Sequence, residues 1–138
     1  MPDSNKAILK AVYQQWHDTR GGSVEQIMQV CDDCISFGSI AEGAAPASFT
    51  ARVAGKQNLH AYFGGLLNEW SMQHYTVHDM VAEGDRVVVI STTAWTNKAT
   101  GKTVETPKVD VWRFNDGRAT EFYEYFDTAR MFAAATPD

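Results

Sequence analysis

The sequence predicts an α+β domain in which three helices come first and an antiparallel sheet follows. Two observations support this order: apolar residues recur every three or four positions up to Trp70, and strand-forming Val, Thr, Tyr and Trp dominate from residue 72 onward. A third is Asn115-Asp116-Gly117, a hairpin turn between two strand-like segments. The 138 residues suit one domain, residues 1–138, that buries roughly two-thirds of its unfolded surface.

Each predicted helix has one apolar face. Ser4 is placed to cap the first helix, which is expected to end at Gly21-Gly22. Ser23 is placed to cap the second, with Gln26 three residues on. The apolar positions are Ile8, Leu9, Val12, Tyr13 and Trp16 in the first helix, Val24, Ile27, Met28 and Cys31 in the second, and Leu59, Tyr62, Phe63, Leu66, Leu67 and Trp70 in the third.

Strands are expected in five segments. They are Cys34 to Phe37, residues 72–82, residues 86–96, Val104 to Phe114 and Ala119 to Asp127. Residues 38–55 show no period and are rich in Gly, Ala, Ser and Pro, which predicts a long loop at the rim of a pocket. Residues 128–138 are expected to form a short tail.

The last two strands carry large apolar groups on both faces. Because side chains alternate along a strand, Asp110 and Trp112 lie opposite to Val109 and Val111. On the last strand, Phe122, Glu124 and Phe126 lie opposite to Tyr123 and Tyr125. The first set is expected to meet the helices. The second set would be a large bare patch, so we expect a second copy of the chain to cover it as a homodimer.

Composition narrows the possible partners. Twelve Lys and Arg against 17 Asp and Glu give a net charge of −5, which disfavours nucleic acid and anionic membranes. No stretch approaches 18 consecutive apolar residues, and the first ten residues lack a secretory h-region, so we expect a cytoplasmic protein. Cys31 and Cys34 are expected to be reduced and structural, and the four histidines form no ligand pattern. Neither a metal nor a cofactor is expected.

One segment resembles a known family. The segment from Val109 to Asp127 reads V109-D-V-W-R-F-N-D-G-R118 followed by T120-E-F-Y-E-Y-F-D127. It resembles the pattern of the nuclear transport factor 2 (NTF2)-like superfamily: an apolar strand, R-F, an acidic-Gly turn and an E-h-W-D segment, where h is apolar. The order of elements resembles the same superfamily over nearly the whole chain, and within it the SnoaL-like polyketide cyclases and ketosteroid isomerases. The resemblance implies a cone, with three N-terminal helices packed on a strongly curved, mainly antiparallel sheet that encloses a pocket.

The resemblance also suggests site residues. Tyr13, in Y13-Q-Q-W-H-D18, and Asp110 match the oxyanion-binding tyrosine and aspartic acid of ketosteroid isomerases. The isomerase base should fall near Gly38, which has no side chain. Glu124 falls on the base of the SnoaL-like cyclases and on an acid of the limonene epoxide hydrolases.

The epoxide hydrolases need an additional Arg-x-Asp, but those positions read Ser91 and Thr93 here. Both steroid isomerisation and epoxide hydrolysis by the family's known residues are therefore disfavoured.

The hairpin brings two acids together. It pairs residues whose numbers sum to roughly 233, which places Asp110 near Phe122 to Glu124. Burial should disfavour the charged form of Glu124, and one of two close carboxylates should stay protonated, which would give an acid and a base. Lys108 shares the strand face of Asp110. If it turned inward, it would hold Asp110 ionised and remove it as a donor.

Two functions remain open at this stage. The first is a cofactor-free isomerase, cyclase or lyase-like enzyme on a small hydrophobic carbonyl compound, with Glu124 as base and with Asp110 and Tyr13 at the oxyanion. The second is a binding protein for a hydrophobic small molecule, with no chemistry. Either would use a pocket lined by Trp16, Phe37, Phe63, Trp70, Ser91, Thr93, Trp95, Trp112, Phe122 and Phe126.

Overall fold

The computed structural model describes residues 2–138, and the side chains of residues 4–138. Its elements are α1 (Pro2–Asp18), α2 (Val24–Val30), β1 (Cys31–Ser39), η1 (Ser48–Thr50), β2 (Val53–Ala54), η2 (Lys56–Asn58), α3 (Leu59–Glu69), β3 (Trp70–Glu83), β4 (Arg86–Asn97), β5 (Thr103–Asn115), β6 (Arg118–Phe126) and α4 (Thr128–Ala135). None of the helices in residues 2–138 is long and apolar enough to cross a membrane.

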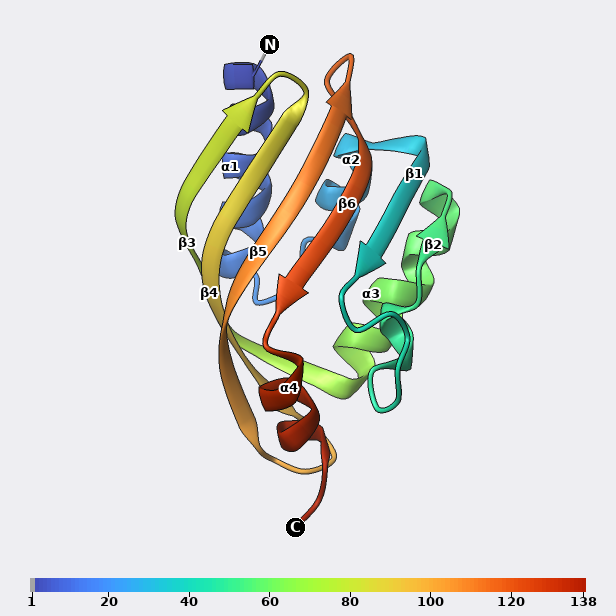
Figure 1. The fold of residues 1–138 in the computed structure, drawn as a ribbon, viewed down its shortest axis with the longest axis vertical. Helices are drawn as coiled ribbons and strands as arrows, with labels where there is room; N and C mark the ends of the chain where they lie inside the picture. The colour runs from blue at the N-terminus through green and yellow to red at the C-terminus, as the bar shows by residue number, and fades with distance from the viewer. Residues whose placement is uncertain (1) are drawn as a thin grey trace.

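The six strands form one curved sheet in the order β2-β1-β6-β5-β4-β3. Figure 1 shows α1, α2 and α3 behind this sheet, while α4 lies below the end of β6. All neighbouring strands are antiparallel except β1 and β6, which run parallel. The predicted α+β cone is therefore confirmed, with the main core between the helices and the concave face of the sheet.

The register of the β5–β6 hairpin brings the two acids opposite each other. Asp110 pairs with Glu124, and Val111 pairs with Tyr123. The prediction that Asp110 lies near Phe122 to Glu124 is confirmed. The hairpin follows from Asp116 and Gly117, whose positive φ angles of 50° and 76° suit a tight turn.

The C-terminal segment was predicted as a tail, and this prediction was wrong. Residues Thr128–Ala135 form α4, and the Asp127 side chain accepts a hydrogen bond from the backbone N–H of Arg130 at 3.0 Å. This is an N-cap, which satisfies a free donor of the first turn. Met131 and Ala134 are buried, so packing stabilises a helix too short to be stable alone.

The predicted caps of the first two helices were also wrong. Ser4 lies inside α1, which begins at Pro2. Ser23 precedes α2, but its side chain makes no capping hydrogen bond. Cys31 does not end the second helix; it begins β1, three residues before the predicted strand start.

The loop predicted over residues 38–55 contains two short elements. β2 pairs with β1, and η1 packs against α3. The close approach depends on Gly65 of α3, because a Cβ built there would lie 2.3 Å from Cβ of Phe49. Phe49 itself lines the cavity described below, so part of this loop belongs to the pocket wall.

The neighbouring glycines of α3 provide a matched test of this contact. We expect Gly65→Ala to lower the free energy of unfolding by about 1–3 kcal/mol, because Phe49 must move. Gly64→Ala should raise it by about 0.5–1 kcal/mol, because no atom lies within 4 Å of its added Cβ and alanine favours the helix. Urea denaturation measures both, and equal effects of the two variants would contradict this packing.

Candidate functional site

A cavity of about 100 Å³ lies between the concave face of the sheet and the helices. Its wall is mostly aromatic and aliphatic, and its charged residues are Lys108, Asp110 and Glu124. The other lining residues are Val12, Tyr13, Trp16, Ile27, Phe37, Phe49, Tyr62, Phe63, Leu66, Trp70, Tyr75, Thr93, Trp95, Val104, Thr106, Trp112, Phe122, Phe126 and Met131. A mostly apolar cavity with a few converging polar groups is typical of a small-molecule site.

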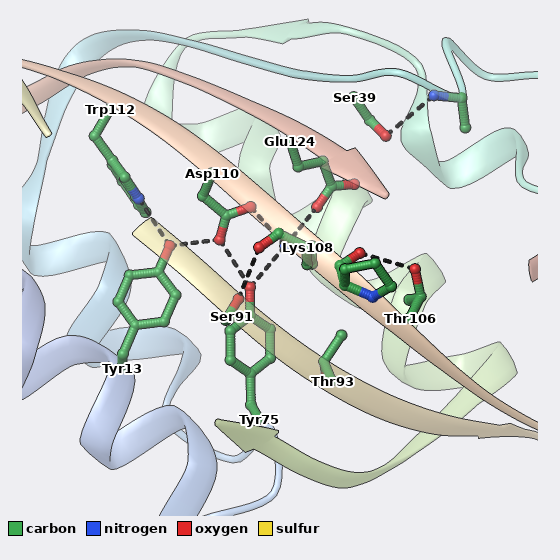
Figure 2. A network of polar contacts seen from close by, with 12 residues as sticks. Tyr13, Ser39, Tyr75, Ser91, Thr93, Thr106, Lys108, Asp110, Trp112 and Glu124 are labelled. Atoms are coloured by element: carbon green, nitrogen blue, oxygen red, sulfur yellow. Dashed lines mark hydrogen bonds and ion pairs between the residues drawn. The ribbon is translucent and has the colours of Figure 1, made fainter. Parts of the chain in front are cut away.

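Lys108 lies between the two buried acids. Its Nζ is 2.8 Å from Oδ1 of Asp110 and 3.1 Å from Oε1 of Glu124. Asp110 is 1% exposed and Glu124 is 3% exposed, so water contributes little to their solvation. Figure 2 shows the three side chains pointing toward one another from adjacent strands. The lysine charge therefore stabilises both carboxylates where burial alone would not.

Three tyrosines complete the cluster from outside β5 and β6. Tyr13 of α1 donates to Oδ2 of Asp110 at 2.5 Å, and Tyr75 of β3 donates to the same oxygen at 2.8 Å. Tyr62 of α3 donates to Oε1 of Glu124 at 2.8 Å. A buried hydroxyl needs a partner, and here each hydroxyl proton is directed to a carboxylate.

Two further hydrogen bonds fix the positions of these donors. The indole N–H of Trp112 donates to the hydroxyl of Tyr13 at 2.8 Å, and Lys108 Nζ donates to the hydroxyl of Tyr75 at 2.9 Å. Tyr13 and Tyr75 therefore each donate one hydrogen bond and accept another.

The cluster shifts the pKa of its donors upward. Burial raises the pKa of Tyr13 and of Tyr75, and the charge of Asp110 raises both further. Burial raises the pKa of Tyr62, and the charge of Glu124 raises it further. Burial by itself lowers the pKa of Lys108, but Asp110, Tyr75 and Glu124 together raise it well above its ordinary value. The lysine thus stays charged and the tyrosines stay neutral at pH 7.

The inward orientation of Lys108 changes the expected role of Asp110. Its carboxylate accepts hydrogen bonds from Tyr13, Tyr75 and Lys108. The expectation that Asp110 donates to an oxyanion does not fit these contacts, because every group around Asp110 is itself a donor. The alternative, in which Lys108 holds Asp110 ionised, fits them.

One oxygen of the cluster remains without a partner. Among residues 4–138, Oε1 of Glu124 takes the contacts to Tyr62 and Lys108, and Oε2 takes none. Among the same residues, two fully buried side-chain atoms lack a hydrogen bond, Ser23 Oγ and Trp70 Nε1. Oε2 is not one of these two, so it is not fully buried. Because Glu124 lines the cavity, Oε2 is a polar atom that a bound molecule can reach.

The predicted wall residues lie around the cavity with one exception. Trp16, Phe37, Phe63, Trp70, Thr93, Trp95, Trp112, Phe122 and Phe126 all line it. Ser91 does not, because its buried hydroxyl donates to the backbone carbonyl of Lys108. Tyr62 and Tyr75 were missed as polar members of the site. Tyr62 was assigned only to an apolar helix stripe, although the need of a buried hydroxyl for a partner could have indicated its role.

Gly38 lies on the outer face of β1, not in the cavity. A Cβ at Gly38 would lie 2.9 Å from Cδ1 of Tyr123, whose side chain is on that outer face. The neighbouring Ser39 pairs with Glu124 and is buried. Gly38 therefore has no access to the cavity, and its inward-facing neighbour, Ser39, has no carboxylate either.

The cysteines lie away from the cavity wall. Cys31 is buried and Cys34 is exposed, and both are free thiols. Burial raises the pKa of Cys31 to about 12, so its thiol is a poor nucleophile at pH 7. Within the described residues, no group of three or more His, Cys, Asp or Glu side chains is arranged to hold a metal ion.

Comparison with known proteins assigns the family. A SnoaL-like domain model matches residues 10–122, so the chain belongs to the SnoaL-like domain family. This confirms the resemblance inferred from the sequence. No curated protein matches the chain in sequence.

Solved structures share the whole fold. An NTF2-like protein of unknown function from Burkholderia pseudomallei is 22% identical, with a TM-score of 0.85, and the match covers 96% of this chain and 98% of that one. TerC, co-crystallised with polyporic acid, is also 22% identical over 96% of this chain and 98% of its own, with a TM-score of 0.82.

A third similar structure is a hypothetical protein with a ketosteroid isomerase-like fold from Catenulispora acidiphila, in complex with trimethylamine. It is 14% identical, with a TM-score of 0.76, over 95% of this chain and 93% of that one. At these identities the three likenesses show the fold.

The raised pKa values predict a steep loss of stability at alkaline pH. Tyr13, Tyr62, Tyr75 and Lys108 all hold their protons more tightly in the folded chain than in the unfolded chain, whose values are near 10. Their stabilising effect is complete below pH 10 and is lost as the pH rises toward the folded values. Above that point these four groups together should lower the free energy of unfolding by roughly 5–6 kcal/mol per pH unit, with an equal share from each group.

Urea denaturation between pH 8 and pH 11.5 measures this slope. Tyr13→Phe removes one of the four groups and should make the slope shallower by about 1 kcal/mol per pH unit. A stability that stays flat to pH 11.5 would mean that these groups titrate as they do in the unfolded chain.

Proposed function

We propose that this chain is a cofactor-free proton-transfer enzyme that acts on a small apolar carbonyl compound, with Glu124 as its base. The observation that carries the proposal is the unpartnered Oε2 of an otherwise fully engaged, buried cluster. A carboxylate oxygen at an apolar cavity wall is a suitable proton acceptor, since little water competes with the substrate for it.

The proposed step moves one proton and conserves charge. Oε2 of Glu124 takes a proton from the carbon next to the substrate carbonyl, and the C–H electron pair moves to the carbonyl oxygen to form an enolate. In a β,γ-unsaturated carbonyl compound this enolate is a dienolate, and return of the proton from Glu124 to its γ carbon completes an isomerisation. Attack of the enolate on a second carbonyl of the same molecule would instead form a C–C bond and an alkoxide, which takes the proton back from Glu124 to complete a cyclisation.

The cluster supports this step through Lys108 and Tyr62. Tyr62 donates a hydrogen bond to Oε1 of Glu124, and Lys108 forms an ion pair with the same oxygen, while Glu124 is charged. When Glu124 becomes neutral, these bonds weaken, and the same donors can turn toward the new oxyanion. Asp110 and Tyr13 act as positioning residues in this scheme. Asp110 accepts hydrogen bonds from Lys108 and Tyr13, and the hydroxyl proton of Tyr13 is used in that bond, so neither residue has a free proton to donate to the substrate.

The alternative proposal is a binding protein for a hydrophobic small molecule. It is favoured by the absence of a carboxylate at Gly38 or Ser39 and of an Arg-x-Asp at Ser91 and Thr93. TerC and the Catenulispora protein were crystallised with small molecules, which fits either function. Direct measurement of proton abstraction distinguishes the two.

Deuterium exchange provides that measurement without a known substrate. The wild-type chain should accelerate exchange into the carbons next to the carbonyl of cyclopentanone in D₂O, followed by NMR. Glu124→Gln keeps the shape but removes the acceptor, so it should lose on the order of 10²-fold or more of the acceleration. Glu121→Gln makes the same change on the exposed outer side of β6 and should leave the rate unchanged.

Saturable binding of the ketone with no exchange above background would reject the enzyme and leave the binding protein. Exchange that survives Glu124→Gln would assign the base to another residue.

The outer face of the sheet supports a homodimer. An apolar row crosses four strands, from Val81 through Val88 and Val111 to Tyr123. A second row runs beside it from Ile90 through Val109 to Tyr125, and both Ile90 and Tyr125 are exposed. We propose that a second copy of the chain covers both rows.

Val111→Asp places a charge in the middle of this face and should shift the dimer to monomer in sedimentation velocity. Ala7→Asp, an exposed change on α1, is the control and should leave the dimer intact. A wild-type chain that sediments as a monomer would contradict the interface.

A further inference from the structure

The buried cluster carries an unbalanced charge. Lys108 supplies one positive charge, and Asp110 and Glu124 supply two negative charges. These three are the charged residues of the cavity wall. With both acids ionised, the cavity has a formal charge of −1. An uncompensated charge in an apolar site is costly, and a ligand of opposite charge relieves that cost.

The hydrogen-bonding groups of the cluster are unbalanced in the same direction. Lys108 donates hydrogen bonds to Asp110 and Tyr75 and forms an ion pair with Glu124, and the hydroxyls of Tyr13, Tyr62 and Tyr75 all donate to carboxylates. The donors are therefore used, and the free capacity is an acceptor, Oε2 of Glu124. A ligand that fits must bring a donor, and an ammonium group brings three donors and no acceptor.

The cavity wall also suits a cation. Six of its aromatic residues, Trp16, Phe37, Tyr62, Phe63, Trp95 and Phe122, surround the remaining space. Aromatic faces attract organic cations, and the attraction is stronger where water is excluded. Lys108 already shows this behaviour, since its Nζ lies 5.6 Å from the ring centre of Phe122 and 5.1 Å from that of Tyr75.

From these three features we propose that the cavity binds small hydrophobic amines in their protonated form, with the ammonium group against Oε2 of Glu124 and the hydrocarbon part against the aromatic wall. The inference rests on the same ionised Glu124 as the proposed function, but it requires no turnover. In an enzyme that uses Glu124 as a base, such an amine is a competitive inhibitor.

The test compares three molecules of similar size at pH 7, each titrated into the wild-type chain and followed by protein NMR. Isobutylamine is a cation, isobutanol is its neutral counterpart, and isovalerate is an anion. All three are small enough for a cavity of about 100 Å³. Isobutylamine should bind on the order of tenfold more tightly than isobutanol, since a hydrogen bond between charged groups exceeds a neutral one by that factor. Isovalerate should not bind at the same concentrations.

Two variants locate the amine. Glu124→Gln should reduce the affinity for isobutylamine to that for isobutanol and leave isobutanol unchanged, whereas Glu121→Gln should change neither. Equal affinities of the amine and the alcohol for the wild-type chain would overturn the proposal, because a proton held within the cluster would then have removed the charge. Amine binding that survives Glu124→Gln would also overturn it, because the amine would then lie elsewhere.

The amine and ketone experiments fail independently. Selective amine binding without ketone exchange leaves this inference and rejects the enzyme. Ketone exchange without selective amine binding would support the enzyme and reject this inference.

Discussion

Lys108 places a positive charge between two carboxylates inside a cavity that is otherwise apolar, and the position of each surrounding polar group depends on it. Without that charge, Asp110 and Glu124 would repel each other across one strand pair and would be neutralised by a shared proton. With it, both can stay ionised and accept hydrogen bonds from tyrosines on α1, α3 and β3. The cluster therefore connects three elements to the middle of the sheet through polar contacts.

Much of this arrangement can be predicted from alternation and turn chemistry. Asn115-Asp116-Gly117 determines the hairpin register, and the register places Asp110 opposite Glu124. The face of Lys108 is equally predictable, because it is two residues from Asp110 on the same strand. The direction of a long side chain is not, since a lysine at a strand face can extend to water or turn to a buried acid with the same backbone.

The helix α4 and the face of Gly38 could not be predicted, because they depend on tertiary contacts that local sequence patterns do not indicate. α4 is short, and its stability comes from burying Met131 and Ala134 and from the Asp127 cap. Gly38 was placed by alignment with the isomerase base, but Gly38 pairs with the outward-facing Tyr123 and its neighbour Ser39 pairs with the inward-facing Glu124. A one-residue shift along a strand moves a side chain to the other face, so a motif match one residue off points to the wrong side of the sheet.

The charge of the cluster connects the proposed reaction to the proposed ligand. Transfer of a proton from a ketone to Glu124 moves the single excess negative charge from the carboxylate to the enolate, so the total charge in the cavity does not change. An amine uses the same excess charge differently, because it pairs with the carboxylate and leaves no acceptor for a carbon-bound proton. An anionic ligand is disfavoured in either state, since it meets the excess negative charge and the N–H groups of Lys108 are already engaged by Asp110, Tyr75 and Glu124. The same electrostatic arrangement thus permits an enolate to form inside the cavity, because the proton transfer that creates the enolate charge also neutralises Glu124. It disfavours the entry of an anion from outside, because Glu124 then keeps its own negative charge.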